Sequence, residues 1–386
     1  MTETNTLIIG GSFSGLACAA CLGKNKVNYL LIEKADQIGN PWRNHYERLH
    51  LHTHKALSHL PHLPFPSKTD KYPSRQEVVQ YLDDYCWEMG IFPKLNTEAQ
   101  RIYKEGERWL VITNKEPIVC ENLILASGPF GKPRKGNWKG EEQFQGPILH
   151  SSQYKSGRDF RGKRMLVVGF GNSACEIALD LHEQGAFPSL SVRSAVNVLP
   201  RDILGIPVLQ IGVWMSSIPP KLADKLNAPL IKFLTGDIEK LGLKKLPYGP
   251  LEQITTHQQV PLLDLGTLKL IRDGNCPVFG EISHLEPHQV VFKDGKTLDA
   301  DGIIAAIGYE KNYGQHLMDL TKERIQDLSL PIQKQQFAGK DGLYFCGYYI
   351  SPTGQIREIA SDAQWIAQQI LKDQKKKNQV ALAKTQ

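Results

Sequence analysis

The sequence predicts an α/β protein built from two dinucleotide-binding domains, one of which is inserted into the other. Two stretches carry this prediction, because "NTLIIGGSFSGLACAACLG" at 5–23 and "KRMLVVGFGNSACEIALDL" at 163–181 each read as an apolar strand, a glycine-rich turn and a helix. A third observation is that apolar runs typical of buried parallel strands continue between 302 and 349. We therefore expect the first domain to resume after the second.

Length and composition limit the classes of protein to consider. A chain of 386 residues is long enough for two or three domains, and 41% hydrophobic with 22% charged residues is typical of a soluble globular protein. The formal net charge of +6 is mild, and no basic stripe is interleaved with aromatic residues. We therefore expect no nucleic-acid binding. The N-terminus has no basic segment followed by an apolar run, so no secretory signal is predicted.

The seven cysteines are scattered, and an odd number without framework spacing favours reduced thiols in a cytoplasmic protein. Cys18 and Cys21 form a C-x-x-C, which could be a redox pair. They lie among small apolar residues of the predicted first helix, so packing within that helix is the preferred interpretation.

The first glycine-rich turn joins the strand "TLIIG" to the helix "LACAACLGK". A helix N-terminus presents unpaired N–H groups and the positive end of a dipole, and glycines let a pyrophosphate approach them. Gly10 and Gly15 take the outer positions of G-x-G-x-x-G, and Ser12 takes the middle one with a hydroxyl that could donate to phosphate. The next strand ends in Glu33, whose carboxylate would bind an adenosine ribose and repel a 2′-phosphate. We assign to FAD the residues Gly10, Ser12, Phe13, Ser14, Gly15, Glu33 and Lys34.

The second turn repeats this pattern with the opposite charge at the end of its second strand. Gly169 and Gly171 occupy the first two glycine positions, and Ala174 occupies the third, where only close helix packing is needed. After the strand "LSVRS", a guanidinium suits a 2′-phosphate and no acid opposes it. We assign to NADPH the residues Gly169, Gly171, Asn172, Ser173, Arg193, Ser194 and Arg201. The alternative is a pair of such units of which one has lost its ligand.

Three further strands end in small residues and a glycine: "NLILASG" at 122–128, "GIIAAIGY" at 302–309 and "GLYFCGYY" at 342–349. Small residues at a strand end allow a ligand or a crossing chain to pass close to the sheet. The helix "IREIASDAQWIAQQILK" follows at 356–372. The expected boundaries are 1–155 and 300–372 for the FAD-binding domain, 156–299 for the NADPH-binding domain, and 373–386 for a flexible Lys-rich tail.

The most apolar stretch is "ILGIPVLQIGVWMSSIPPKL" at 203–222. It is interrupted by Pro207, Gly212 and the pair Pro219–Pro220, and it reaches only about the minimum length that spans a bilayer. We expect a buried lid or the wall of a substrate tunnel. A contact with one membrane leaflet is the alternative.

One motif between the two turns resembles a known family. "FQGPILHSSQY" at 144–154 matches F-x-G-x-x-x-H-x-x-x-Y of flavin-containing monooxygenases, and Tyr154 stands where the related Baeyer–Villiger enzymes prefer Trp. "YERLHLHTHK", "YPSRQEVVQYLDDY" and "PLLDLGTLKLIRDG" are similar to the YUCCA-type branch, and the resemblance covers about residues 5–370. The chain departs from the family at Ser12, and at the family's A-T-G strand ends, which are Ala126-Ser127-Gly128 and Ala306-Ile307-Gly308.

The resemblance implies an NADPH- and O₂-dependent flavin monooxygenase that acts through a C4a-(hydro)peroxyflavin. Its implied substrate is a 2-oxo acid such as indole-3-pyruvate, which is converted into the acid one carbon shorter with loss of carbon dioxide. N- or S-oxygenation of a soft nucleophile is an alternative within the same chemistry. An NADPH-dependent flavin disulfide reductase and an NADPH oxidase or sensor are alternatives of other classes. Substrate identity and oligomeric state stay open.

The resemblance also adds site residues. Trp42 in "IGNPW" corresponds to the family's G-G-x-W segment, and Gly347 falls in its final flavin-contacting turn. His52 corresponds to the residue beside the flavin peroxide and is the candidate catalytic residue, although it could also be a histidine without a chemical role. His50, His52 and His54 would share one face of an extended segment, which suits zinc, but no cysteine or carboxylate cluster completes such a set and we expect no metal.

Overall fold

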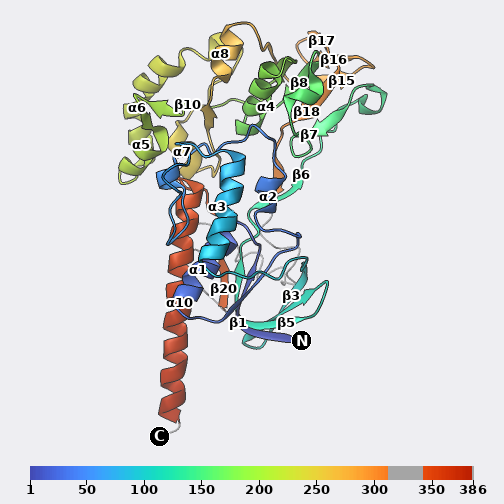
Figure 1. Cartoon of the computed structure of the whole chain (residues 1–386). Helices are drawn as coiled ribbons and strands as arrows, with labels where there is room; N and C mark the ends of the chain where they lie inside the picture. Colours follow the sequence, from blue (N-terminus) through green and yellow to red (C-terminus); the bar gives the residue numbers. More distant parts are fainter. Residues whose placement is uncertain (312–341, 385–386) are drawn as a thin grey trace. The chain divides into compact units, whose positions relative to one another are not determined.

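The computed structural model of the chain describes residues 1–311 and 342–384, and Figure 1 shows its ribbon. It has the α/β fold that the sequence predicts, divided into two compact units. Unit 1 comprises Met1–Arg43, His54–Gly131 and Lys311–Gln386, and unit 2 comprises Asn44–Thr53 and Lys132–Glu310. The segments 44–53, 132–155 and 300–310, which the expected boundaries placed in the first domain, belong to unit 2.

The sheet of unit 1 has the strand order β2-β1-β5-β4-β3, and β20 pairs with β5. β2, β1, β5 and β20 run parallel, and Ile9 lies in register with both Ile32 and Leu125, so that the strands' carboxyl ends meet at one edge. The strands are β1 (Thr2–Ile9), β2 (Tyr29–Ile32), β3 (Ala99–Glu105), β4 (Arg108–Thr113), β5 (Ile118–Leu125) and β20 (Leu343–Phe345).

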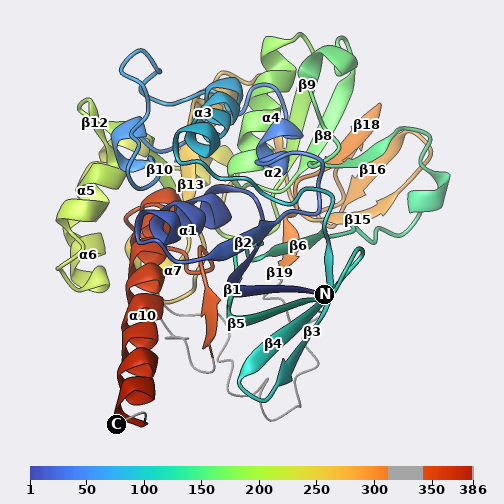
Figure 2. The same ribbon diagram turned by 60° about the horizontal axis from the view of Figure 1, so that its bottom comes forward.

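The helix α1 (Phe13–Lys24) follows the first glycine-rich turn and is deeply buried in unit 1. Its residues from Phe13 to Leu22 are all buried, because alanines, cysteines and glycine let the sheet and α10 (Gln355–Lys384) approach closely. Figures 1 and 2 show α10 beside α1. The other helical elements of unit 1 are α2 (Asn40–Arg43), η1 (Lys55–Leu57) and α3 (Arg75–Glu88).

The C-terminal segment differs from the expected flexible tail, because α10 continues as a helix to Lys384. Residues 373–384 contain neither Gly nor Pro, so nothing in the sequence stops the helix. Two contacts also hold it to unit 1: the Gln374 amide donates to Asn5 Oδ1 at 2.9 Å, and Lys377 Nζ lies 2.7 Å from Glu121 Oε2.

Unit 2 contains a five-stranded parallel sheet in the order β14-β9-β8-β18-β7, in which α4 (Asn172–Glu183) connects β8 to β9. An antiparallel three-stranded sheet packs against it through a core that includes Leu166, Phe292 and Ile303. The strands of the first sheet are β7 (Ile148–His150), β8 (Arg164–Val168), β9 (Phe187–Ser191), β14 (Val278–Phe279) and β18 (Gly302–Ala305). Those of the second are β15 (Ile282–Leu285), β16 (Gln289–Phe292) and β17 (Thr297–Asp299).

A largely helical segment separates β9 from β14. It contains the helices α5 (Val208–Trp214), α6 (Pro220–Thr235), η4 (Glu239–Leu241), α7 (Pro250–Thr255) and α8 (Thr267–Arg272). Its strands form two small sheets, which are β10 (Val198–Pro200) with β13 (Leu262–Asp264), and β11 (Asp202–Ile203) with β12 (Ile206–Pro207). The remaining elements are β6 (Phe130–Pro133) paired with β19 (Tyr309–Lys311), η2 (Glu141–Gln143) and η3 (Gly157–Phe160).

The four fixed residues of the motif at 144–154 make structural contacts within unit 2, which explains why this segment belongs there. Phe144 lies in the core between the two sheets, and a Cβ on Gly146 would lie 2.5 Å from the Asp301 carbonyl oxygen. His150 Nε2 donates to the Gly308 carbonyl at 3.1 Å. The Tyr154 hydroxyl donates to Asp180 Oδ2 on α4 at 2.6 Å, and both residues are buried.

The segment 203–222 also differs from the expected buried lid or tunnel wall. It forms the β11–β12 hairpin, α5 and the first turn of α6, and no residue of α5 is buried. Leu204 at the tip of the hairpin is 89% exposed. Among the residues that the structure describes, no helix is long and apolar enough to cross a membrane.

Candidate functional site

The turn after β1 is confined between two neighbouring strands. Gly10 has φ 115° and its N–H donates to the Ile32 carbonyl, at the end of β2, at 2.9 Å. A Cβ on Gly10 would lie 2.7 Å from the Ala126 carbonyl oxygen at the end of β5, and one on Gly15 would lie 1.8 Å from the Gly10 carbonyl oxygen. Only glycine fits at both positions, so α1 begins directly on the strand end with its N–H groups open to a ligand.

Other predicted residues of unit 1 lie at this turn. Ser12 is the N-cap of α1, but its side chain makes no capping hydrogen bond. Gly347, far along the chain, has φ 78°, and a Cβ there would lie 2.3 Å from Ser14 Oγ. Gly347 therefore lies directly against the start of α1. A backbone this close to a helix N-terminus suits a narrow anionic group such as a pyrophosphate.

Glu33 follows β2 and is fixed beside the same turn. Its Oε2 accepts the Gly11 N–H at 2.6 Å, and its Oε1 accepts the Ala35 N–H at 2.9 Å. Each carboxylate oxygen keeps a further lone pair for a ribose hydroxyl. Lys34 next to it is exposed.

Trp42 is brought to the turn by the loop before it. The Gly39 N–H donates to the Gly11 carbonyl at 2.8 Å, and the Trp42 ring meets the Phe13 ring edge-on with centroids 6.0 Å apart. The structure thus gathers the sequence-predicted residues of unit 1 around one turn.

The turn after β8 in unit 2 has the same local geometry. Gly169 has φ 122°, its N–H donates to the Ser191 carbonyl at the end of β9 at 2.9 Å, and a Cβ on it would lie 2.5 Å from the Ala306 carbonyl oxygen. The glycines that close the two A-x-G strand ends, Gly128 and Gly308, both have φ 79°. The two turns are therefore built alike, although the sequences around them differ.

At the start of α4, the space beside Gly171 is open, and the side chains of Asn172 and Ser173 interact with other segments of the chain. A Cβ on Gly171 would meet no atom within 4 Å, so the space in front of this residue is free to admit a phosphate. Asn172 Oδ1 accepts the Leu263 N–H at 2.9 Å, and the Ser173 hydroxyl hydrogen-bonds to the Tyr46 hydroxyl. These two side chains therefore position neighbouring segments as well as the helix terminus.

The predicted 2′-phosphate residues separate into two groups. Arg193 and Ser194 are exposed and come directly after β9, two and three residues beyond the carbonyl that binds Gly169. Arg201 follows β10 and is half-buried, with its Nε 3.5 Å from Asp202 Oδ2. The charge of Arg201 is thus partly compensated within the chain, and Arg193 is the better candidate for a phosphate.

His52 belongs to unit 2, where the segment 44–53 packs along α4. Its Nε2 contacts Glu176 Oε1 on α4, and the Glu176 side chain is only 2% exposed. Glu176 also interacts with the Tyr46 hydroxyl, and burial together with this carboxylate raises the pKa of Tyr46 well above its ordinary value. Glu176 Oε2 is buried without a hydrogen-bond partner, so this carboxylate retains a free acceptor.

Sequence reasoning missed Glu176 and Tyr46. One signal was present, because Glu176 and Asp180 stand four residues apart on the apolar face of a predicted buried helix. Acids at such positions are rarely buried without a partner. The partners could not be identified from the sequence, since Glu176 binds His52 and Tyr46 from a segment more than 120 residues earlier.

A second contact holds the segment 44–53 against α4. Arg48 donates through Nε and a terminal nitrogen to the two oxygens of Glu183, at 2.8 Å each. This bidentate pair holds the pKa of Glu183 below its ordinary range.

The three neighbouring histidines do not act as a set. His50 Nδ1 hydrogen-bonds to the Arg48 carbonyl at 2.7 Å, and His54 Nδ1 accepts the Ala56 N–H at the start of η1. His52 contacts the buried acid Glu176. Within 1–311 and 342–384, no group of three His, Cys, Asp or Glu side chains is placed to hold a metal ion.

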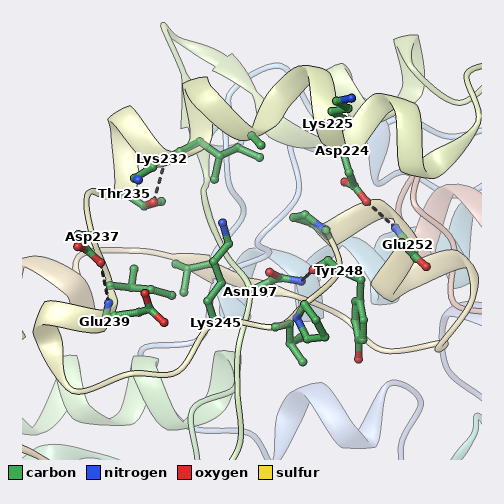
Figure 3. Close-up of a pocket in the computed structure, with 18 of the residues that line it drawn as sticks. Asn197, Asp224, Lys225, Lys232, Thr235, Asp237, Glu239, Lys245, Tyr248 and Glu252 are labelled. Carbon is green, nitrogen blue, oxygen red and sulfur yellow. Dashed lines mark hydrogen bonds between the residues drawn. The ribbon is translucent and has the colours of Figure 1, made fainter.

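A pocket of about 840 Å³ lies elsewhere in unit 2, between α6, α7 and the loop before α7 (Figure 3). Asn197, Lys232, Lys245 and Tyr248 are among its lining residues. No sequence-predicted site residue lines it, and the nucleotide turn at 169–173 is not part of it. We therefore base the site on the geometry of the two turns.

Comparison with known proteins identifies the family. Residues 7–198 match the pyridine nucleotide-disulphide oxidoreductase family. The chain is 37% identical to indole-3-pyruvate monooxygenase YUCCA6 of Arabidopsis thaliana, over 98% of this chain and 92% of that protein. It is 34% identical to indole-3-pyruvate monooxygenase YUCCA1 of Oryza sativa subsp. japonica, over 89% and 86%.

The chain belongs to the YUCCA-type branch of the flavin-containing monooxygenases. As a member of this family it is a flavin-dependent monooxygenase, an oxidoreductase whose cofactors are FAD and NADPH. The resemblance drawn from the sequence is confirmed.

Solved structures show that this fold is shared across enzyme classes. A flavin-containing monooxygenase from Stenotrophomonas maltophilia aligns with TM-score 0.68 and 18% identity, covering 96% of this chain and 99% of that one. A bacillithiol disulfide reductase from Staphylococcus aureus aligns with TM-score 0.67 and 16% identity, covering 97% and 99%. The fold by itself therefore does not distinguish a monooxygenase from a disulfide reductase.

The two turn glycines of unit 2 give a matched pair of substitutions. Gly171→Ala places a methyl group in open space, so the protein should fold normally while its affinity for NADP⁺ falls about tenfold or more, since the methyl occupies the approach of the pyrophosphate. Gly169→Ala forces a strained backbone against the Ala306 carbonyl and should lower the free energy of unfolding by about 2 kcal/mol or more. Urea unfolding and nucleotide titration measure both effects. Unchanged NADP⁺ affinity in Gly171→Ala would contradict the assignment.

Glu176 and Glu183 give a second matched pair, because both lie on α4 and bind the segment 44–53. Glu176→Leu leaves the buried Tyr46 hydroxyl and His52 Nε2 without their acceptor, which should lower the free energy of unfolding by about 1–3 kcal/mol. Glu183→Leu removes a half-exposed ion pair and should cost about 1 kcal/mol or less. Equal losses in denaturant unfolding would show that Glu176 has no special role in holding this segment.

Proposed function

We propose that this enzyme uses NADPH and O₂ to decarboxylate a 2-oxo acid oxidatively, with indole-3-pyruvate as the leading substrate. The observation that carries the proposal is the pair of turns with one geometry and opposite charges at the following strand end, Glu33 in unit 1 and Arg193 in unit 2. Such a pair suits two different dinucleotides. The substrate class is supported by the printed activity of the relatives.

In unit 1, we assign the FAD pyrophosphate to the N–H groups at the start of α1 and to Ser12, whose hydroxyl does not cap its own helix. Glu33 would accept the adenosine ribose hydroxyls, and Trp42 would lie beside the flavin end of the cofactor. The absence of space for a Cβ at Gly10 and Gly347 fits this assignment. When bound, FAD accepts a hydride from NADPH and activates O₂.

In unit 2, we assign the NADPH pyrophosphate to the open space at Gly171 and to the N–H groups that follow it. The Asn172 side-chain oxygen accepts the Leu263 N–H, so its amide nitrogen is the group that would donate to the phosphate. Arg193 and Ser194 would bind the 2′-phosphate, with Arg201 contributing less because Asp202 already neutralises part of its charge.

His52 is the candidate proton-handling residue, and Glu176 fixes how it acts. A carboxylate only accepts hydrogen bonds, so the His52 Nε2 that contacts Glu176 must carry a proton. In the neutral ring, Nδ1 then has the free lone pair. His52 can therefore accept a hydrogen bond or a proton at Nδ1, while the Tyr46 hydroxyl interacts with the same Glu176 side chain.

The overall reaction balances without another reductant or oxidant. One 2-oxo acid, one O₂, one NADPH and one proton give the acid one carbon shorter, carbon dioxide, NADP⁺ and water. The C–C bond between the ketone and the carboxylate breaks, one oxygen atom enters the product acid, and the other leaves as water. The protein's part is to hold the cofactors, exclude water and control the protons, for which His52 Nδ1 is our candidate.

Two observations argue against a disulfide reductase, which shares the fold. Cys18 and Cys21 lie on α1 with exposed fractions of 1% and 2%, and burial raises the pKa of Cys21 to about 12. A protonated, buried thiol is a poor nucleophile for disulfide exchange. All seven cysteines are free, which also supports our proposal of a cytoplasmic location.

The direct test is to mix purified flavoprotein with NADPH, indole-3-pyruvate and O₂ labelled with heavy oxygen. We expect the acid one carbon shorter, with one labelled oxygen atom per molecule and one NADPH consumed. Hydrogen peroxide formed in equal amount to the NADPH consumed would instead identify an oxidase. Turnover of a disulfide without O₂ consumption would identify a reductase, and label in an N- or S-oxide alone would move the substrate class to soft nucleophiles.

Arg193→Ala should weaken NADP⁺ binding about 10- to 100-fold and leave NAD⁺ binding nearly unchanged, because only NADP⁺ has the 2′-phosphate that the guanidinium binds. Lys163→Ala is the charge-matched control, since this exposed lysine precedes β8 at the opposite end of the parallel sheet. It should leave both dissociation constants unchanged. Equal weakening of both nucleotides by Arg193→Ala would refute the role of Arg193.

A further inference from the structure

The helix α6 carries an apolar stripe that nothing in the described structure covers. The stripe consists of four large apolar residues whose spacing places them on one side of the helix, and they are between 41% and 83% exposed. They are Leu222, Leu226, Leu230 and Phe233. Only Ala223, Asp224 and Thr235 of α6 are buried. A solvated helix normally turns its apolar side to the core, so this stripe needs a partner outside the described chain.

The helix before it extends the same surface. Trp214 at the end of α5 is 63% exposed, and the two helices are held together where Asn227 Nδ2 on α6 lies 2.9 Å from Met215 Sδ just after α5. Figures 1 and 2 both show α5 and α6 side by side. We call Trp214, Leu222, Leu226, Leu230 and Phe233 together the α5–α6 apolar face.

Positive charges flank this face. Three lysines of α6 each come one residue before a residue of the apolar face, which places them about 100° away round the helix. They are Lys221, Lys225 and Lys232, and all three are exposed. Lys221 lies 3.6 Å from Glu252 and is partly compensated. Within 1–311 and 342–384, no acid lies within salt-bridge distance of Lys225 or Lys232.

The acidic residue of α6 does not offset these lysines at the surface. Asp224 is buried, and its two carboxylate oxygens accept the N–H groups of Leu251 and Glu252 at the start of α7, at 2.9 Å each. Figure 3 shows it directed towards α7. The exposed charges of α6 are therefore all positive, next to an apolar stripe.

We propose that the α5–α6 apolar face docks on an anionic phospholipid surface, with α6 lying in the plane of the interface. An amphipathic helix with Leu, Phe and Trp on one side and lysines along its flank has the composition of helices that insert shallowly among lipid headgroups. The lysines lie where they would meet anionic headgroups while the stripe enters the acyl boundary. This peripheral contact needs no spanning helix.

Charge makes a lipid surface a better occupant than a second copy of the chain. Two copies joined through this face with their α6 helices antiparallel would bring the two lysine flanks together, and like charges repel. The pocket beside α6 is lined by the side of the helix that carries Lys221, Lys225 and Lys232, and no residue of the apolar face lines it. The face is thus a surface rather than a groove for a peptide.

The test is co-sedimentation of the full-length holoenzyme with vesicles of phosphatidylcholine, with and without phosphatidylserine, at low and at high salt. We expect binding to the phosphatidylserine vesicles at low salt, weakened at high salt, and little binding to pure phosphatidylcholine. Phe233→Asp should weaken vesicle binding about tenfold or more, and Lys225→Glu with Lys232→Glu should do the same. Flavin content and far-UV circular dichroism check that each variant is folded.

Phe92→Asp is the matched control, because Phe92 is 82% exposed, close to the 83% of Phe233, but lies in a loop of unit 1. Vesicle binding should survive this change. The proposal is overturned if the wild type does not bind anionic vesicles at low salt, if it binds neutral vesicles equally well, or if Phe233→Asp binds as the wild type does. A dimer that Phe233→Asp converts to monomer, without vesicle binding, would assign the face to a second copy instead.

Discussion

Both nucleotide-binding turns depend on the close approach of a turn glycine to the carbonyl oxygen at a neighbouring strand end. Gly10 lies against Ala126 and Gly169 against Ala306, and neither leaves space for a Cβ. This contact sets each helix directly on the edge of its sheet, where the unpaired N–H groups face outward. Glu33 and Arg193, which we propose distinguish the two cofactors, come after the strands whose last carbonyls accept the N–H groups of Gly10 and Gly169. On this proposal, the two turns share one backbone geometry and the residue after the following strand selects the cofactor.

The segment 44–53 connects this frame to the proposed chemistry. It leaves unit 1 in the sequence but packs in unit 2, where Glu176 and Glu183 of α4 bind His52 and Arg48. The helix whose N-terminus we assign to NADPH therefore also holds His52, the candidate proton carrier, through Glu176. Any change that moves α4 is expected to alter nucleotide binding and the position of His52 together.

The elements that sequence reasoning identified are those whose local geometry restricts the residue type. The turn glycines belong to this group, because a positive φ or a close carbonyl contact admits few alternatives. Glu33 was found from its place directly after β2, where its carboxylate binds the turn. Glu176 was missed because its partners come from a distant part of the chain. The exposure of α5 and α6 was also missed, since an apolar pattern shows which side of a helix is hydrophobic and not what covers it. The helical continuation to Lys384 depends likewise on contacts, those of Gln374 and Lys377, that the sequence does not reveal.

The central claim is that one turn holds FAD and the other NADPH in a form that allows electrons to pass between them. The most direct measurement is the visible absorbance of the purified protein during anaerobic titration with NADPH. We predict a yellow protein whose flavin band is bleached by one equivalent of NADPH, and by NADH only at much higher concentration. A protein that stays colourless after incubation with FAD, or a bound flavin that NADPH does not bleach, would contradict the account.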